Sequence, residues 1–397
     1  MRISTLSTFL QGVRAMQRVQ SLVAETQQQV ASGRRILKPS DDPTGASNAV
    51  TIRESLSRIE QFDRNSTTAQ RRLEYEESAL GAVTEALQRV RELTLQANNA
   101  TETQASRGQI AVEIREMLAD LVQTANRKDG NGRYLFAGGR DDVAPVSTSA
   151  GNYVYNGDQT RRLIRIGESR QIFDGDTGAD VFFNIRSGNG DYRVGVDAAN
   201  TGSGVVAESS VTDPAAWDQG SYSVQFVDPS NYEVRNASGA VIATAAFVPG
   251  DAIEFQGISF RVDGAPAAGD RFQVEPARYQ SLFESVANIA DALDRGAVDD
   301  ASLAQLSSAL NLGLEELDNA LANVSDTRTL VGIRLSAVET SRDNNSVTSL
   351  LVQREMSELE DLDYAEALSR LTAQASTLEA AQLSFARTQQ LSLFQFL

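Results

Sequence analysis

Residues 31–50 read ASGRRILKPSDDPTGASNAV, and this stretch decides the fold because it joins two long helical patterns. Gly33 ends the first pattern. Pro39 and Pro43 cannot lie inside a helix, because proline lacks a backbone N–H and clashes with the turn before it. Asp41 or Asp42 can cap the second helix, with Pro43 as its first residue. These five residues are therefore predicted to form a hinge between two helices.

The segment before the hinge, Thr5–Ala31, carries apolar residues at heptad spacing. One row repeats every seven residues and consists of Phe9, Met16, Val23 and Val30. A second row begins with Leu6 and Val13 and continues with Gln20 and Gln27. Two such rows predict an amphipathic helix with a half-apolar seam, which is typical of a coiled coil.

The segment after the hinge, Pro43–Ala97, repeats this spacing along two apolar rows. Ser66 interrupts one row and Glu76 interrupts the other. An unbroken helix of about 55 residues would measure about 80 Å, far longer than ordinary globular helices, which predicts a rod. The polar stretch Asn98–Arg107 is predicted to turn the chain into a third helix over Gln109–Asn126.

From Arg133 to Pro276 the sequence alternates short β patterns with Gly, Asn, Asp and Pro. Apolar and polar residues alternate cleanly in Tyr222–Val227 and Ile258–Val262, as in half-buried antiparallel strands. The other strand candidates are Arg133–Ala137, Tyr153–Tyr155, Arg162–Ile166, Asp180–Phe183, Tyr192–Val196, Tyr232–Arg235, Val241–Ala246, Ala252–Phe255 and Arg271–Val274. This region is predicted to be an inserted β domain.

Helical patterns return at Tyr279, and the last segment, Leu359–Leu397, mirrors the first. Its main row is Tyr364, Leu371, Leu378 and Phe385, and a second row begins at Leu368. The chain ends on the apolar residues Leu391, Leu393, Phe394, Phe396 and Leu397. Two terminal helices packed only on each other would leave several apolar side chains in water, namely Leu10, Val19, Leu22 and Leu383. The terminal seams are therefore predicted to be buried between subunits.

The predicted fold class is α+β: an elongated antiparallel helical bundle or coiled coil formed by both chain ends, with an inserted antiparallel β domain. Three domains are expected. Residues 1–42 and 351–397 would form a terminal coiled-coil domain. Residues 43–180 and 276–350 would form a helical rod with a β-hairpin, and residues 181–275 the inserted β domain.

Charge and composition disfavour several functions. A net charge of −17 and a pI near 4.6 argue against nucleic acid and membrane surfaces as partners. The chain has no cysteine and no histidine, which removes disulfides, thiolate metal sites and the usual general base of hydrolases. No Sec-type signal peptide follows Met1, and no apolar run approaches the roughly 18 residues of a membrane span. A cytoplasmic protein and a leaderless export substrate both fit these features.

No catalytic, cofactor-binding or metal-binding residues are predicted. Asp174, Asp176 and Asp180 suggest a calcium loop, but the spacing places Ile185 where the glutamate ligand belongs, so a β-turn is expected. The acidic cluster over Glu358–Asp363 spreads around a helix and is expected to be a solvated surface. An enzyme or a carbohydrate-binding adhesin would need carboxylates converging near Trp217 in the insert, and the sequence shows no such convergence.

Several short motifs are spread over both helical ends and the start of the insert: MRIST at residues 1–5, SGRR at 32–35, PSDDP at 39–43, NGRYLFAG at 131–138, YNGD at 155–158, LDYAEA at 362–367 and SLF at 392–394. Together they resemble the flagellar hook-associated protein 3 family of the flagellin superfamily. Flagellin usually lacks the Asp-Asp-Pro of the hinge. Hook-associated protein 1 usually carries an Asn-rich motif ending in Gly-Tyr, which is absent here.

The resemblance implies a structural subunit, not an enzyme, exported by the flagellar type III apparatus to the hook–filament junction. It implies a ring of copies between hook-associated protein 1 and flagellin, without cofactors, and a chaperone that masks the C-terminal helix before secretion. The first alternative is a flagellin-like filament subunit. The second, from another functional class, is a binding or enzymatic module carried by the β insert. The residues predicted to be buried between subunits are Leu6, Phe9, Val13, Met16, Val23, Val30, Tyr364, Leu368, Leu371, Leu378 and Phe385.

Overall fold

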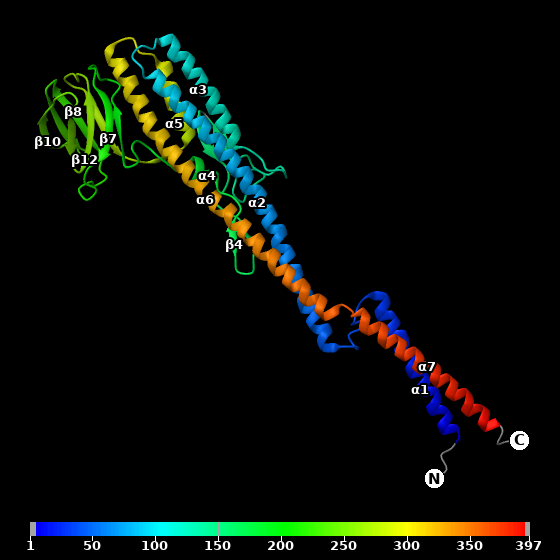
Figure 1. Cartoon of the computed structure of the whole chain (residues 1–397). Coiled ribbons are helices and arrows are strands. Elements are labelled where there is room, and N and C mark those ends of the chain that lie inside the picture. The colour runs from blue at the N-terminus through cyan, green and yellow to red at the C-terminus, as the bar shows by residue number, and fades with distance from the viewer. Residues whose placement is uncertain (1–4, 150, 394–397) are drawn as a thin grey trace. The chain divides into compact units, whose positions relative to one another are not determined.

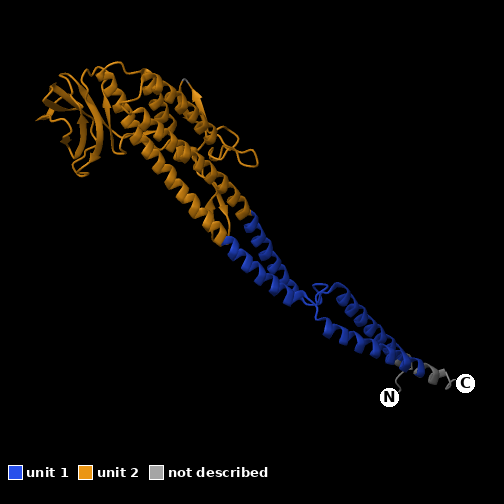
Figure 2. Cartoon of the chain, turned by 45° about the horizontal axis from the view of Figure 1, so that its top comes forward, with its two compact units in different colours: residues 1–64, 341–397 blue, residues 65–340 orange. Residues whose placement is uncertain are grey.

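The computed structural model describes residues 5–149 and 151–393, and their contacts form two compact units. Unit 1 comprises residues 1–64 and 341–397, and unit 2 comprises residues 65–340 (Figure 2). Unit 1 is therefore built from both ends of the chain, and unit 2 from the segment between them. The finer division into three domains stays a prediction.

The described residues form seven helices (Figure 1). These are α1 Thr5–Ser32, α2 Pro43–Ala97, α3 Gln104–Ala125, α4 Gly178–Phe182, α5 Leu282–Arg295, α6 Asp300–Glu360 and α7 Tyr364–Leu393. The long helices α1 and α2 confirm the heptad reading. Helix α3 begins earlier than predicted, because the Thr103 hydroxyl accepts a hydrogen bond from the Ser106 N–H and caps it. Residues 361–363 separate α6 from α7, so the last helix begins at Tyr364, within the segment predicted from Leu359 onward.

The helical core of unit 2 is formed by α2, α3, α5 and α6. Leu73, Leu80 and Leu87 from the predicted apolar row of α2 are fully buried. Burying such a side chain contributes about 1.5–3 kcal/mol. The two residues that interrupt the rows, Ser66 and Glu76, are also buried, so the interruptions point into the core.

Fourteen strands lie in the described part of the chain. They are β1 Val146–Ser149, β2 Asn152–Tyr155, β3 Leu163–Arg165, β4 Gln171–Phe173, β5 Ile185–Arg186, β6 Tyr192–Val196, β7 Val205–Val211, β8 Tyr222–Asp228, β9 Asn231–Asn236, β10 Val241–Ala246, β11 Ala252–Phe255, β12 Ile258–Asp263, β13 Arg271–Pro276 and β14 Tyr279–Gln280. The strand order is β10-β9-β8-β13-β6 in one sheet and β11-β12-β7 in another. Two-stranded ribbons are formed by β1 with β2, β3 with β4, and β5 with β14. Every pairing is antiparallel, as predicted.

The two larger sheets share one core, separate from that of the helices. The alternating residues of β8 and β12 point into it, and Phe226, Phe260 and Phe272 are fully buried. Trp217 packs at the margin of this core, with its ring centroid 5.8 Å from that of Tyr192. The pattern of alternation therefore predicted this domain well.

Two of the strand candidates were wrong. Asp180–Phe183 lies largely in α4, because the Thr177 hydroxyl accepts a hydrogen bond from the Asp180 N–H and starts a helix there. This cap also replaces the β-turn expected around Asp176. Arg133–Ala137 forms no strand, although its apolar residues are buried. The Phe136 carbonyl instead accepts hydrogen bonds from the Gly178 N–H and the Tyr155 hydroxyl.

A row of polar side chains on α6 binds the backbone of the β region. Asn319 donates to the carbonyls of Arg186 and Gly188, at 2.9 and 2.8 Å. Along α6, Gln305, Asn311 and Asn323 also donate to backbone carbonyls. The Ser308 hydroxyl instead accepts a hydrogen bond from the Val206 N–H at 3.0 Å. The row therefore satisfies backbone groups of the β region that would otherwise be buried without partners.

No helix within residues 5–149 and 151–393 has both the length and the apolar character needed to cross a membrane. Over the same residues, no group of three or more acidic side chains is arranged to hold a metal ion.

Candidate assembly interface and hinge

Helices α1 and α7 lie antiparallel, side by side, in unit 1 (Figure 1). Near the chain ends the ring centroids of Phe9 and Phe385 are 5.3 Å apart. Further along, the Thr26 hydroxyl is 2.9 Å from the side-chain oxygen of Gln374. The seam between the two helices thus joins apolar contacts with polar ones.

Most of the predicted interface residues lie in this seam within one chain, and they are only partly covered. The half-buried ones are Val13, Met16, Val23, Val30, Leu371, Leu378 and Phe385. Phe9, Tyr364 and Leu368 are exposed. The side chains of Leu6 and of the apolar tail after residue 387 lie outside the described residues. Their burial between subunits stays a prediction.

The apolar residues expected to remain in water largely do so. Leu10, Leu22 and Leu383 are 44%, 42% and 57% exposed. Val19, the fourth of that set, is half-buried. The pair of helices therefore covers part of its apolar surface and leaves several leucines exposed.

The best-buried side chains of the pair were not predicted. They are Ala367 on α7, and Thr26 and Gln29 on α1. The Gln29 amide donates to the Arg35 carbonyl at 2.9 Å, so this glutamine connects α1 to the hinge. Gln29 lies outside both heptad rows, and no local pattern in the sequence predicts its bond to the hinge.

The hinge is attached to the joint between α6 and α7 by backbone hydrogen bonds. The Arg35 N–H donates to the Glu360 carbonyl at 2.7 Å, and the Leu362 N–H donates to the Gly33 carbonyl at 3.0 Å. The Arg35 guanidinium adds a bond to the Leu359 carbonyl at 2.9 Å. Two short segments more than 320 residues apart in sequence are thereby held together.

Within the hinge, the predicted residues have separate roles. Gly33 has a φ of 71°, a left-handed conformation that favours glycine and ends α1. The Asp41 carboxylate accepts a bond from the Lys38 N–H at 2.8 Å and closes a turn that contains Pro39. The Asp42 carboxylate accepts a bond from the Gly45 N–H at 2.8 Å. Asp42, and not Asp41, is therefore the cap of α2.

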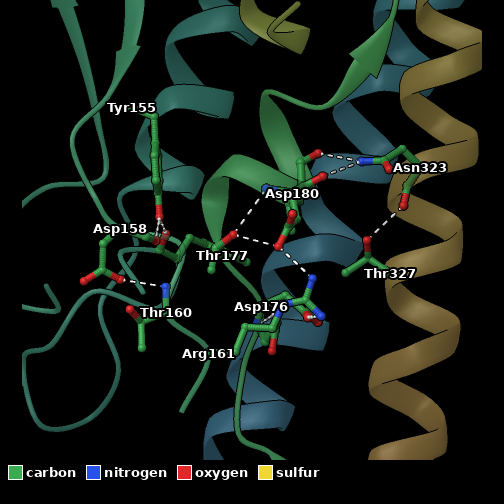
Figure 3. Close-up of polar contacts among 12 residues, drawn as sticks. Tyr155, Asp158, Thr160, Arg161, Asp176, Thr177, Asp180, Asn323 and Thr327 are labelled. Atoms are coloured by element: carbon green, nitrogen blue, oxygen red, sulfur yellow. Dashed lines mark hydrogen bonds and ion pairs between the residues drawn. The ribbon is translucent and has the colours of Figure 1, made fainter. Parts of the chain in front are cut away.

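A cluster of charged side chains lies in unit 2 where the segment around Asp176 meets α2 and α6 (Figure 3). Arg334 binds both carboxylate oxygens of Asp176, at 2.7 and 3.0 Å. Asp180 accepts bonds from Arg161 and from the Thr177 hydroxyl, both at 2.8 Å (Figure 3). Arginines thus neutralise the aspartates that suggested a calcium loop.

Glu76 completes this cluster from α2. One of its carboxylate oxygens accepts the Asp176 N–H at 2.9 Å, and the other is buried without a partner in the described residues. Burial, reinforced by the negative charge of Asp176, raises the pKa of Glu76 to about 8. This carboxyl group is therefore mostly protonated at neutral pH.

Comparisons with known proteins agree with these features. Residues 3–141 match the family model described as the bacterial flagellin N-terminal helical region, and residues 314–397 match the C-terminal helical region. Residues 196–276, in the insert, match the D2-like domain of flagellar hook-associated protein 1. Both helical ends and the β insert therefore resemble parts of flagellar proteins.

Full-length relatives are hook-associated proteins. The chain is 27% identical to flagellar hook-associated protein 3 of Escherichia coli K12 over 395 residues, covering 100% of this chain and 99% of that protein. A flagellin of Salmonella derby is 23% identical and covers only 66% of this chain and 56% of its own length. Flagellin thus matches a smaller part of the chain.

Two crystal structures are similar over most of this chain. FlgL of Xanthomonas campestris is 32% identical, with a TM-score of 0.73, and covers 77% of this chain and 99% of its own. Hook-associated protein 3 of Legionella pneumophila is 31% identical, with a TM-score of 0.75, and covers 78% and 98%. The chain therefore belongs to the flagellar hook-associated protein 3 family, the structural proteins of the junction between the flagellar hook and its filament.

Proposed function

We propose that copies of this chain form a ring between hook-associated protein 1 and flagellin, and that α1 and α7 are buried between neighbouring subunits there. The observation that carries this proposal is the shallow seam of the terminal pair. Leu22 and Leu383 are about half exposed, whereas Leu80 and Leu87 in unit 2 are completely buried. Covering the exposed half of such a leucine contributes about 1 kcal/mol, so several of them covered by neighbouring helices would stabilise the pair substantially.

The hinge is proposed to set the direction in which α1 and α7 leave the end of α2 and α6 within unit 1. Gly33, Asp42 and Pro43 fix the backbone at this point, and Arg35 ties it to the end of α6. On this proposal the terminal domain follows the predicted boundaries 1–42 and 351–397, with the rod and the insert as separate parts.

The route to the flagellum is proposed from the same helices. The chain would be secreted through the flagellar export apparatus, and a cytoplasmic chaperone would cover α7 until then. The exposed Leu368 and Leu383 offer the apolar surface that such a chaperone would bind. The proposal includes no enzymatic activity, cofactor, nucleic acid or membrane, and this agrees with the structural role of the flagellar relatives.

Replacement of Leu383 by Asp tests the proposal in cells that express only the variant. Leu383 is 57% exposed, so the isolated chain should keep its circular dichroism spectrum, while filaments should detach and flagellin should appear in the medium. Val112→Asp on α3 is the matched control, because Val112 is 58% exposed but lies in unit 2. Normal filaments on Leu383→Asp cells would contradict burial of this surface between subunits.

Limited proteolysis of the purified chain provides an independent measurement. The first ~30 and last ~40 residues should be cut faster than the helical core of unit 2, because their apolar seam is only partly covered. Equal resistance of all three regions would show that the terminal helices are already fully folded without neighbours.

A further inference from the structure

The hairpin of β3 and β4 carries a cluster of positive charge, although unit 2 as a whole is acidic. Residues 65–340 contain 23 Arg and Lys against 39 Asp and Glu, a formal net charge of −16. Residues 161–170, by contrast, contain four arginines and one glutamate. A local excess of positive charge on an acidic surface attracts acidic partners and orients them during encounter.

Two of the four arginines are already engaged within the chain. Arg161 binds Asp180 at 2.8 Å, and Arg162 pairs with Asp174. Arg165 and Arg170 are exposed and form no ion pair within the part of the chain that the structure describes. These two guanidinium groups are therefore available to another molecule.

The hairpin also presents an apolar side chain beside these charges. Its register pairs Leu163 with Phe173, Ile164 with Ile172 and Arg165 with Gln171. Ile172 belongs to the helical core of unit 2, and Ile164 packs against that core. Alternation places Leu163 and Arg165 on the opposite face, where Leu163 is 54% exposed. The outward face thus combines one leucine with positive charge.

Helix α2 carries a complementary surface, which we call the acidic stripe: Glu74, Glu85 and Glu92, all exposed. Their spacings of 11 and 7 residues return to the same side of a helix. Glu92 is partly neutralised by Arg89, at 3.2 Å. Neither Glu74 nor Glu85 forms an ion pair in the described residues, although Glu74 accepts a hydrogen bond from the Gln70 amide at 2.9 Å and the charge of Glu85 acts on Arg328. Both carboxylates are exposed and can accept further contacts.

We propose that Leu163, Arg165 and Arg170 of one copy contact the acidic stripe of a neighbouring copy. The two surfaces belong to different elements, so the contact is head-to-tail, and repeated contacts of this kind can close a ring. The inference deepens the proposed function and rests on it, because it adds a lateral contact in unit 2 to the one made by α1 and α7.

A cysteine cross-link tests this contact directly, because the chain contains no cysteine of its own. Arg165→Cys combined with Glu85→Cys should, after mild oxidation of isolated hook–filament junctions, give a ladder of covalently linked copies. Arg170→Cys with Glu74→Cys is a second pair, in case the first alters folding. Arg165→Cys with Val112→Cys is the control, which pairs the hairpin with an exposed residue of α3 and should give no ladder.

The outcomes separate the inference from the proposed function. If both double variants are present in junctions but remain monomeric, or become linked only to another flagellar protein, the contact between copies is wrong while the ring proposal stands. If even the unmodified chain is absent from isolated junctions, the proposed function itself is wrong.

Charge reversal provides the energetic test. Arg165→Glu with Arg170→Glu should lower the fraction of cells with attached filaments at least tenfold. Adding Glu74→Arg and Glu85→Arg to the same chain should restore most of this loss, since it restores opposite charges across the contact. Failure of the restoration, with all variants folded, would overturn the charge pairing.

Discussion

Replacement of Glu76 by glutamine should remove a large pH dependence from the stability of unit 2. Glu76 is 2% exposed, and its pKa is raised from 4.5 to about 8 by burial and then by Asp176. Glutamine keeps the acceptor for the Asp176 N–H but cannot lose a proton. The variant therefore isolates the titration of one buried carboxyl group.

The direction of the pH dependence follows from whether the folded or the unfolded chain binds the Glu76 proton more tightly. The folded chain holds the Glu76 proton more tightly than the unfolded chain, so this group stabilises the fold fully below pH 4.5. That contribution is lost as the pH rises through about 8. The full difference, from 4.5 to about 8, corresponds to about 5 kcal/mol at 1.36 kcal/mol per pKa unit. Between about pH 5 and pH 7 the loss is about 2–3 kcal/mol.

The charge balance of the cluster also predicts that the fold is more stable when Glu76 is protonated. Around Glu76 lie four arginines and four aspartates, namely Arg72, Arg161, Arg162 and Arg334 with Asp129, Asp174, Asp176 and Asp180. A neutral Glu76 leaves these opposite charges equal in number, and an ionised Glu76 adds an unpaired negative charge. A buried carboxylate in that position is costly without its own partner.

Urea unfolding followed by circular dichroism measures the effect at about pH 5, 6 and 7. The free energy of unfolding of the wild-type chain, minus that of Glu76→Gln, should fall by about 2–3 kcal/mol across this range. Glu74→Gln, the same substitution at an exposed position of the same helix, is the matched control. A flat difference for Glu76→Gln would refute a protonated, buried Glu76.

Three further changes test the hinge, the helical core and the polar row of α6. Gly33→Ala should destabilise unit 1 by about 1–2 kcal/mol, because φ is 71° and the new Cβ would lie 2.9 Å from the Tyr364 hydroxyl. Proteolysis near the hinge should therefore accelerate, and an unchanged cleavage rate would contradict this. Phe283→Ala should cost about 3–5 kcal/mol in urea unfolding, since Phe283 is fully buried against Phe182, and a cost below about 1 kcal/mol would argue against this packing. Asn319→Ala removes two bonds to backbone carbonyls and should cost about 1–3 kcal/mol; hydrogen exchange should quicken in residues 186–190, and unaltered exchange would count against the contact.

The helices could be predicted from the sequence because their signal is long and periodic. The heptad rows placed α1 and α2 almost to the residue, and Pro43 marked the start of α2. Short apolar segments were less informative. Val181–Phe183 fits a strand as well as a helix, and the cap by Thr177 decided in favour of α4. Local hydrogen bonds of this kind override the periodicity of a few residues.

The contacts that attach distant segments could not be predicted, because nothing in a local pattern records them. Arg35 and Leu359 are separated by 324 residues, yet the guanidinium of one binds the carbonyl of the other. Asn319 and Asn323 bind backbone carbonyls of the β region more than 130 residues away, which the helical pattern around them does not indicate. The burial of Glu76, by contrast, could be predicted, because this residue lies within an apolar heptad row of α2.

The two units differ in what stabilises them, and this difference supports different roles. In unit 2 the heptad leucines of α2 are completely buried and the buried Asp176 is paired with Arg334, so the unit has a core of its own. In unit 1 the α1–α7 seam is half-covered, and its firmest attachments are the backbone bonds of Gly33 and Arg35 at the hinge. Those bonds fix where α1 ends and where α7 begins, but they leave apolar side chains exposed along both helices. On the proposed function, neighbouring subunits in the ring bury these side chains. The helix pair is only marginally stable in the isolated chain, so its stability depends on assembly.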